Sequence, residues 1–160
     1  MNKSLLGIVL FTIISGCDFS STLIFEEINE NTWNQDKWKT FNYNNTLPTK
    51  KSSLFWVLRH DNDYPYSNIF FIAENINPKG VKQADTLSFK LARPDGSWLG
   101  TGVYIYEHLL NYKINFNFDN PGIYQFRIRP AVRANDNLVP DKSLDGIHQI
   151  GLEIRTETNE

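Results

Sequence analysis

The chain has 160 residues, 41% of them hydrophobic, and a formal net charge of −2, which together are typical of a single globular domain. Basic residues form no block, and this argues against nucleic acid as a partner and against electrostatic attraction to anionic membranes. Aromatic residues make up 14% of the chain, and their occurrence in short runs favours sheet over helix.

The N-terminus has the pattern of a bacterial lipoprotein signal peptide. Lys3 precedes an apolar stretch at residues 5–14, which is too short to span a bilayer core of about 30 Å as a helix. Ser15 and Gly16 then lead into Cys17, the only cysteine of the chain, and this arrangement resembles a lipobox. We predict a signal peptide over residues 1–16 and lipidation of Cys17, in preference to an ordinary secretory signal followed by a chance cysteine. Two or three acyl chains would anchor the mature protein firmly without a transmembrane segment.

The residues after the signal peptide form a short tether and one domain. Residues 17–22 contain the lipidated cysteine and the polar tether, and residues 23–160 form the domain. Lipidation of Cys17 leaves no thiol for a disulfide, so the stability of the domain must come from its core.

Short apolar runs separated by turn signals predict an all-β domain. Pro-Asp-Gly at residues 94–96 and Asn-Pro-Gly at 120–122 predict tight turns, with a positive φ at Gly96. Residues 30–39 have only a weak helical pattern. We predict an antiparallel β-sandwich of about eight strands, in either jelly-roll or immunoglobulin-like order. The predicted strands cover residues 23–28, 39–43, 55–58, 69–72, 85–92, 103–108, 112–118, 122–129 and 147–155.

The long connection between the two central strands is the candidate partner-binding loop. Turn chemistry alone accounts for most of its polar residues, since Asn and Asp hydrogen-bond nearby backbone while the tyrosines pack inward. The other interpretation is that the two tyrosines are exposed and anchor a partner. The candidate residues are His60, Asp61, Asp63, Tyr64, Tyr66 and Asn68.

No motif predicts catalysis, a metal or a cofactor. His60, His108 and His148 are not at the spacings of metal ligands. Asp61 and Asp63 resemble the start of a calcium loop, but residues 64–66 are Tyr-Pro-Tyr where a third oxygen ligand and a glycine are required. We therefore predict a protein that is not an enzyme.

The aromatic side chains allow an alternative function, an envelope glycan- or peptidoglycan-binding module. On a β-sandwich they would form a platform on which sugar rings stack. The competing and favoured interpretation of Trp56 and Trp98 is that both belong to the core. The candidate platform residues are Trp33, Trp38, Trp56, Trp98, Tyr64, Tyr66 and Tyr104.

Four segments, residues 58–74, 84–102, 121–133 and 144–154, together with the lipobox, resemble the GldH family of gliding motility lipoproteins of Bacteroidetes. The most specific pieces are NDYPYSN at residues 62–68 and PDGSWLGTG at 94–102. The resemblance implies a lipoprotein of the cell envelope, expected in the outer membrane and needed for gliding. It also implies association with the proteins that move and secrete surface adhesins, and no catalytic residues to transfer. The expected role is that of a non-enzymatic scaffold.

Overall fold

The structure, a computed structural model, describes residues 19–46, 51–131 and 142–157. Within these ranges the chain is almost entirely β-strand, interrupted by one short 3-10 turn, η1 at Asn29–Asn31. The strands are β1 Phe19–Glu27, β2 Thr32–Asn34, β3 Lys39–Asn45, β4 Lys51–His60, β5 Asn68–Ile76, β6 Lys82–Lys90, β7 Thr101–Gly102, β8 Tyr106–Asn117, β9 Gly122–Pro130, β10 Ser143–Asp145 and β11 Ile147–Glu157.

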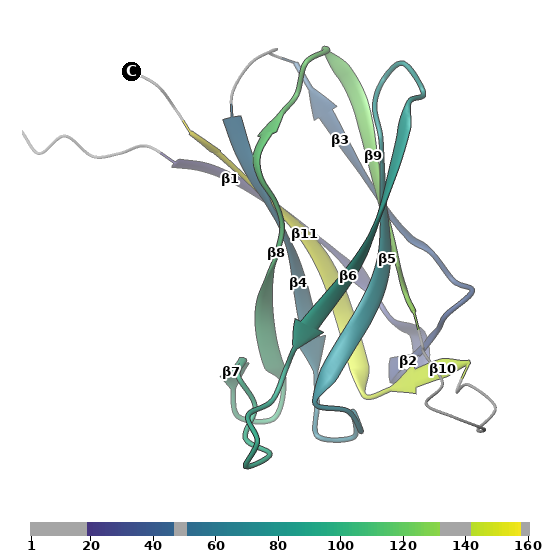
Figure 1. The fold of residues 1–160 in the computed structure, drawn as a ribbon, viewed down its shortest axis with the longest axis vertical. Helices are drawn as coiled ribbons and strands as arrows, with labels where there is room; N and C mark the ends of the chain where they lie inside the picture. The colour runs from purple at the N-terminus through teal and green to yellow at the C-terminus, as the bar shows by residue number, and fades with distance from the viewer. Residues whose placement is uncertain (1–18, 47–50, 132–141, 158–160) are drawn as a thin grey trace, which may run out of the picture.

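Two antiparallel sheets face each other and confirm the predicted all-β sandwich (Figure 1). One sheet has the order β1-β11-β4-β8-β7 and the other β3-β9-β5-β6, while β2 and β10 form a small third sheet. Among the eight long strands, the first pairs with the eighth, the second with the seventh, the third with the sixth and the fourth with the fifth. This is one long hairpin rolled up on itself, which is the jelly-roll order.

Alternating side chains build the core between the two sheets. In β9, Tyr124, Phe126 and Ile128 point inward and are almost fully buried, while the residues between them point to solvent. β4 lies in the middle of its sheet, and both of its faces are covered over most of its length. The largest fully buried side chains are Trp33, Trp56, Phe41, Phe71, Phe126, Leu54, Leu58, Ile69, Leu91, Ile128, Ile147 and Ile150.

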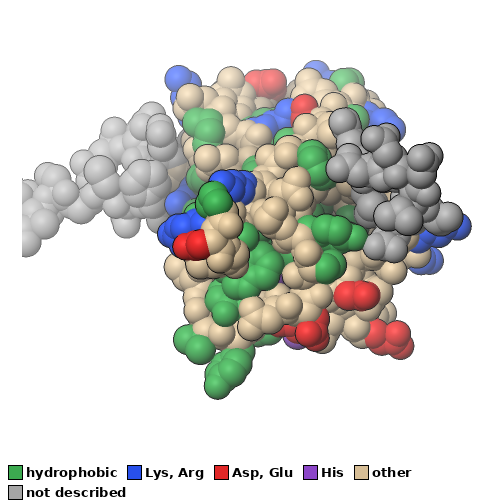
Figure 2. Space-filling model, turned by 60° about the horizontal axis from the view of Figure 1, so that its bottom comes forward, with side chains coloured by type: hydrophobic (Ala, Val, Ile, Leu, Met, Phe, Trp, Pro, Cys, Tyr) green, Lys and Arg blue, Asp and Glu red, His purple; other side chains and the backbone are tan. Residues whose placement is uncertain are grey.

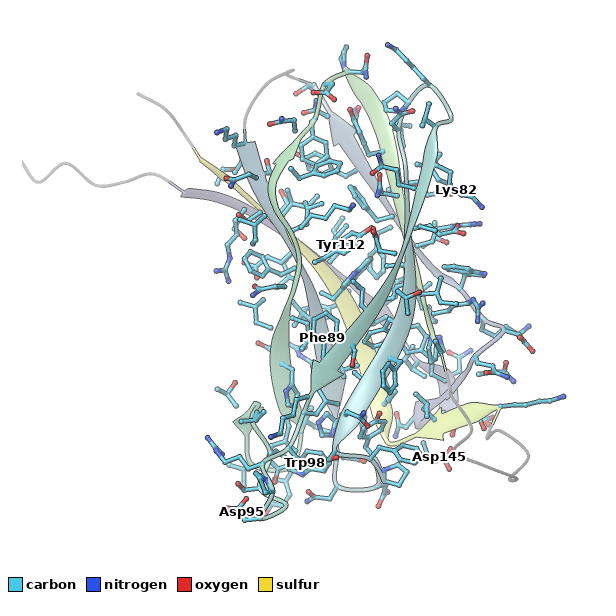
Figure 3. The ribbon with its side chains drawn as sticks, in the orientation of Figure 1. Lys82, Phe89, Asp95, Trp98, Tyr112 and Asp145 are labelled. Carbon is cyan, nitrogen blue, oxygen red and sulfur yellow. The ribbon has the colours of Figure 1, made fainter. Side chains whose placement is uncertain are left out.

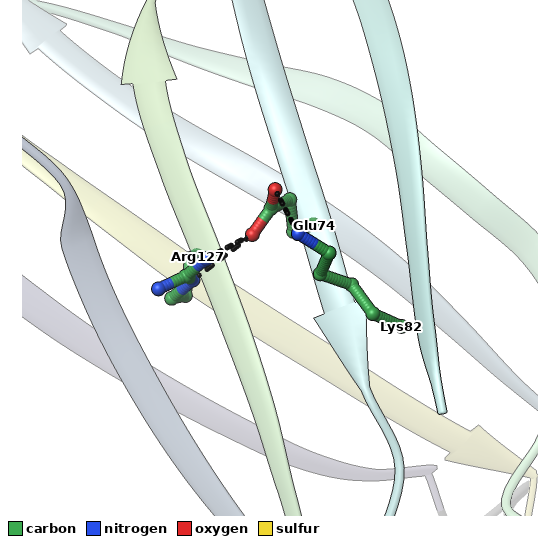
Figure 4. A network of polar contacts seen from close by, with 3 residues as sticks. All are labelled: Glu74, Lys82 and Arg127. Atoms are coloured by element: carbon green, nitrogen blue, oxygen red, sulfur yellow. Dashed lines mark hydrogen bonds and ion pairs between the residues drawn. The ribbon is translucent and has the colours of Figure 1, made fainter. Parts of the chain in front are cut away.

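Polar contacts link neighbouring strands on the outer face of the four-stranded sheet and also join the two sheets between β8 and β6. On the four-stranded sheet, the Glu74 carboxylate accepts hydrogen bonds from Arg127 and Lys82 (Figure 4). Burial alone would raise the pKa of Glu74, but these two cations lower it below its ordinary value. Between the edge strands β8 and β6, the Tyr112 hydroxyl lies 3.3 Å from the Asp85 carboxylate, which Lys113 also approaches at 3.1 Å.

Three segments differ from the prediction. β1 begins at Phe19, so residues 19–22 of the predicted tether lie in a strand. Residues 30–39, whose pattern allowed only a weak helix, contain the strand β2, which pairs with β10 and places Trp33 in the core with 1% exposure. Residues 103–105 were predicted to begin a strand, but they lie in a tight turn after Gly102, whose φ is 141°.

Bulges bend two strands of the five-stranded sheet. The register of β8 against β4 slips twice between Asn111 and Phe116, and Asn115 in this stretch has a φ of 56°. β11 slips once against β4, between Ile147 and Gln149. The extra residue there is His148, and the bulge lies at the end of the sandwich drawn at the bottom of Figure 1.

Candidate functional site

All three histidines of the chain lie together at the lower end of the sandwich in Figure 1, which we call the histidine end. His60 ends β4, His108 faces it from β8, and His148 occupies the bulge of β11. The Nε2 atoms of His60 and His108 lie 2.9 Å apart, although 48 residues separate them in the sequence. Strand pairing, and not sequence spacing, brings these imidazoles together.

The hydrogen bonds of His60 define its tautomer. Its Nδ1 lies 2.8 Å from the carbonyl oxygen of Asp61, which can only accept, so Nδ1 carries the proton. The Nε2 atom of neutral His60 is therefore an acceptor, and the proton between the two rings belongs to His108. Both side chains are buried, with exposures of 0% and 5%. Burial lowers the pKa of His60 and lowers that of His108 to about 4, so both rings are neutral at physiological pH.

Asp61 joins the third histidine to the binding loop. Its Oδ2 lies 2.7 Å from Nε2 of His148, and its Oδ1 accepts the backbone N–H of Asp63 at 2.8 Å. Partial burial would raise the pKa of Asp61, but the hydrogen bonds from His148 and Asp63 lower it overall. Gly146 packs directly against this loop and has a φ of 76°. Only glycine fits there, because a Cβ would lie 2.3 Å from the backbone nitrogen of Tyr64.

The two tyrosines of the loop have different environments. Tyr64 is 2% exposed, its ring lies 5.3 Å from that of His60, and its hydroxyl donates to the Asn68 carbonyl at 2.7 Å. Burial raises the pKa of this hydroxyl. Tyr66 is 38% exposed and places its ring edge-on against Tyr64 at 5.9 Å. Tyr64 thus holds the loop in shape, while Tyr66 lies partly exposed at the surface.

Trp98, at the lower end of the sandwich in Figure 3, packs against His60 of the histidine pair. Its ring meets His60 edge-on at 4.4 Å, and its Nε1 donates to Asn62 Oδ1 at 2.8 Å. Gly100 lies directly against the other histidine of the pair, where a Cβ would lie 2.6 Å from Nε2 of His108. The preceding turn has the positive φ predicted for Gly96, which is 85°.

A projecting turn beside this cluster exposes apolar side chains. Val103 is 74% exposed and Tyr104 is 82% exposed, and Ile105 between the turn and β8 is 37% exposed. With the histidine end turned forward, Figure 2 shows apolar side chains gathered on this surface and acidic ones beside them. Exposed aromatic and branched side chains of this kind are typical of a contact surface for another molecule.

A groove of about 560 Å³ runs between this turn and the outer face of the five-stranded sheet. Its floor is a row of paired residues, in which Arg59 donates to Gln149 at 2.7 Å and to Glu107 at 2.7 Å. Gln149 in turn donates to Glu27. The residues lining the groove are Glu27, Arg59, Thr101, Gly102, Ile105, Glu107, His148 and Gln149.

Comparison with known proteins identifies the family. Residues 23–154 match the GldH lipoprotein family. A protein of Christiangramia forsetii named "Gliding motility lipoprotein GldH homolog" is 38% identical over 156 residues, covering 95% of each chain. "Gliding motility lipoprotein GldH" of Flavobacterium johnsoniae is 34% identical over 151 residues, covering 92% of this chain and 94% of that one. The chain belongs to the GldH lipoprotein family.

Among solved structures, a chain from the infectious bursal disease virus Gx strain covers 87% of this chain with a TM-score of 0.44 and 9% identity, and this chain covers 32% of it. The adhesin domain of Lys-gingipain from Porphyromonas gingivalis has a TM-score of 0.34 and 14% identity. The match covers 87% of this chain and 99% of that domain.

In this GldH family member, the two segments that carry the strongest resemblance meet at the histidine end. Residues 62–68 form the loop after β4, and residues 94–102 bring Trp98 and Gly100 against the histidines. The loop brings His60, Asp61 and Tyr64 into one cluster, whereas Asp63, Tyr66 and Asn68 are exposed. Whether this loop binds a partner stays a prediction, and Cys17 lies outside the described residues.

Sequence reasoning missed His108, His148, Trp98 and the turn at residues 103–105 as parts of this site. One signal was present for His148, because the apolar residues Ile147 and Ile150, both buried in the structure, are three positions apart in the sequence. A regular strand buries every second residue, so this odd spacing indicates a bulge.

Within residues 19–46, 51–131 and 142–157, no group of three or more His, Cys, Asp or Glu side chains is arranged to hold a metal ion. The same ranges contain no helix long and apolar enough to cross a membrane. Trp33 and Trp56 are buried in the core, and Trp38 lies under the guanidinium of Arg127 at 4.8 Å. Of the candidate sugar-stacking side chains, Tyr104 is the most exposed.

Proposed function

We propose that this GldH family member is a lipid-anchored, non-enzymatic scaffold subunit of the gliding apparatus, held in the outer membrane through Cys17. Its partners would be proteins that move and secrete surface adhesins. The observation that carries the proposal is the histidine end, where the loop at residues 62–68 and the segment at residues 94–102 meet and Tyr66 and Tyr104 are exposed. Buried hydrogen bonds beneath that surface keep it rigid, which favours docking because little conformational freedom is lost on binding.

The imidazoles of the histidine end serve as internal hydrogen-bond partners. His60 and His108 bond each other, and His148 bonds Asp61. In the part of the chain that the structure describes, the partners of the imidazoles are another imidazole, a backbone carbonyl and a carboxylate.

The anchor is tested at Cys17. β1 begins at Phe19, and a residue spans at most about 3.6 Å, so lipidation would hold the domain close to the bilayer and near other anchored proteins. Cys17→Ala is expected to abolish labelling by an alkyne fatty acid and to release the protein from membranes or leave it unprocessed. Equal labelling of the wild type and the variant would contradict the lipoprotein anchor.

The docking surface is tested with Tyr66→Ala and Tyr104→Ala. Ile123→Ala is the matched control, because Ile123 is 61% exposed but lies on β9, at the start of that strand and in the other sheet. We expect all three variants to unfold at near wild-type temperatures, and at least one tyrosine variant to lose gliding and in-cell cross-links to envelope proteins. If both tyrosine variants glide and cross-link like the control, the docking surface lies elsewhere.

A second candidate function, binding of an envelope glycan or of peptidoglycan, is favoured by the groove. Its carboxylates, guanidinium and amide offer hydrogen bonds to sugar hydroxyls, and exposed Tyr104 follows two of its lining residues in the chain. A glycan array and a peptidoglycan pull-down test this function. Binding that disappears in Tyr104→Ala would favour it, and no binding by the wild type would exclude it.

A further inference from the structure

Within the described residues, no other strand pairs with the outer side of the edge strand β1. The N–H of Ile28 donates to the His148 carbonyl at 2.8 Å, so Ile28 and every second residue before it face β11. The backbone groups of Glu27, Phe25, Leu23 and the alternate residues before them consequently point away from the sheet. The carbonyl of Glu27 accepts from Lys39, which agrees with this direction.

The other edges of the two sheets carry features that oppose strand addition, whereas on β1 the only charged residues are the two glutamates at its end. β6 begins and ends with lysine and turns Asp85 inward, while β8 is bulged and partly paired with β7. β3 begins with Lys39. β1 has no lysine or proline, and its register with β11 is unbroken over nine pairs. A long and regular edge of this kind accepts another strand readily.

Apolar side chains lie among charged pairs on the outer face of the sheet near this edge. Leu23 is 48% exposed at the edge itself. The Phe25 ring packs on Gly151 of β11 and lies 4.1 Å below the Arg59 guanidinium. Leu109 on β8 is 46% exposed on the same face. A strand added to β1 would lie against Leu23 and reduce its exposure.

We propose that the strand added to β1 is β1 of a second copy of this chain, paired antiparallel about Leu23. In this register Ser21 lies opposite Phe25 and Thr22 opposite Ile24, and the two glutamates at the end of β1 lie opposite the first two residues of the partner strand. No acid faces an acid, and all nine residues of each strand take part. Shorter registers lose backbone hydrogen bonds, so the strand complements itself best at full length.

The pairing joins the two five-stranded sheets into one continuous sheet related by a two-fold axis. Such an interface is isologous and closes at two copies, since it occupies the unprotected edge of each. The two-fold axis is perpendicular to the joined sheet. Phe19 of one copy and Phe19 of the other therefore have the same position along this axis. Both anchors would therefore reach one bilayer, and membrane attachment would raise the local concentration of the copies.

A single cysteine at the two-fold axis tests the pairing in the full chain and in native membranes. In Leu23→Cys the two new thiols would lie directly opposite each other, about 5.5 Å apart at their Cα atoms, within disulfide range. Leu109→Cys is the matched control, because Leu109 has nearly the same exposure on the same face but lies away from the edge. The wild type controls for Cys17, since a cross-link there would report an unmodified anchor cysteine and not the β1 contact.

We expect mild oxidation to give a cross-linked dimer with Leu23→Cys and little or none with Leu109→Cys. Leu23→Pro is the second test, because it removes an N–H that faces the free edge and leaves the bonds to β11 intact. In detergent the wild type should have the mass of two copies and Leu23→Pro that of one, with similar unfolding temperatures. A monomeric wild type, equal cross-linking of both cysteine variants, or cross-linking of Leu23→Cys to a different protein would each overturn the proposal.

Discussion

The buried histidine pair predicts that acid destabilises the protein well above the pH at which its carboxylates titrate. Two imidazoles share one proton across 2.9 Å, and a second proton would place two N–H groups against each other. In the unfolded chain each histidine binds a proton as the pH falls below about 6.5. In the folded protein burial lowers the pKa of His108 to about 4 and also lowers that of His60. Stability is therefore fully present above pH 6.5 and is lost as the pH falls from there toward 4.

The magnitude follows from the shift of His108. A pKa lowered from 6.5 to about 4 corresponds to roughly 3 kcal/mol of lost unfolding free energy at the acid end, to which His60 adds. Urea unfolding at a series of pH values between 7.5 and 4 measures this loss. His108→Gln keeps an N–H that can donate to His60 but cannot be protonated, so its pH dependence should be much shallower. Equal slopes for His108→Gln and the wild type would refute the linkage.

Three substitutions test the packing of the histidine end and of the opposite sheet. Tyr64→Ala should lower the unfolding free energy by about 3–5 kcal/mol in urea titrations, because the side chain is 2% exposed, and a loss no larger than that of Tyr66→Ala would contradict its buried role. Gly146→Ala should be strongly destabilising in thermal unfolding, since the new Cβ would lie 2.3 Å from a backbone nitrogen at a φ of 76°, and an unchanged melting temperature would show that this turn is not constrained. Glu74→Gln should lower the unfolding free energy by about 1–3 kcal/mol, because it weakens the bonds to Arg127 and Lys82. If the wild type and the variant have the same unfolding free energy in high salt, the ion pair is not buried.

The local features of this protein follow from its sequence. Gly96 has the positive φ that its Pro-Asp-Gly turn predicts, because such turns are decided by residues next to one another. Alternation in residues 122–129 predicts the inward face of β9 for the same reason. The family resemblance is also a property of the sequence, and the matches over residues 23–154 confirm it.

The tertiary structure alone decided the order of the strands and the composition of the histidine end. Alternating patterns fix which face of a strand is buried, but they do not fix its neighbour, so jelly-roll and immunoglobulin-like orders fit the sequence equally well. The contacts of the site join residues 48 and 87 positions apart, and they depend on the register of β4 with β8 and on the bulge of β11. The tertiary structure also decides the different environments of Tyr64 and Tyr66, which are only two residues apart in one loop. The Tyr64 ring packs against His60 in the core, whereas the Tyr66 ring stays at the surface.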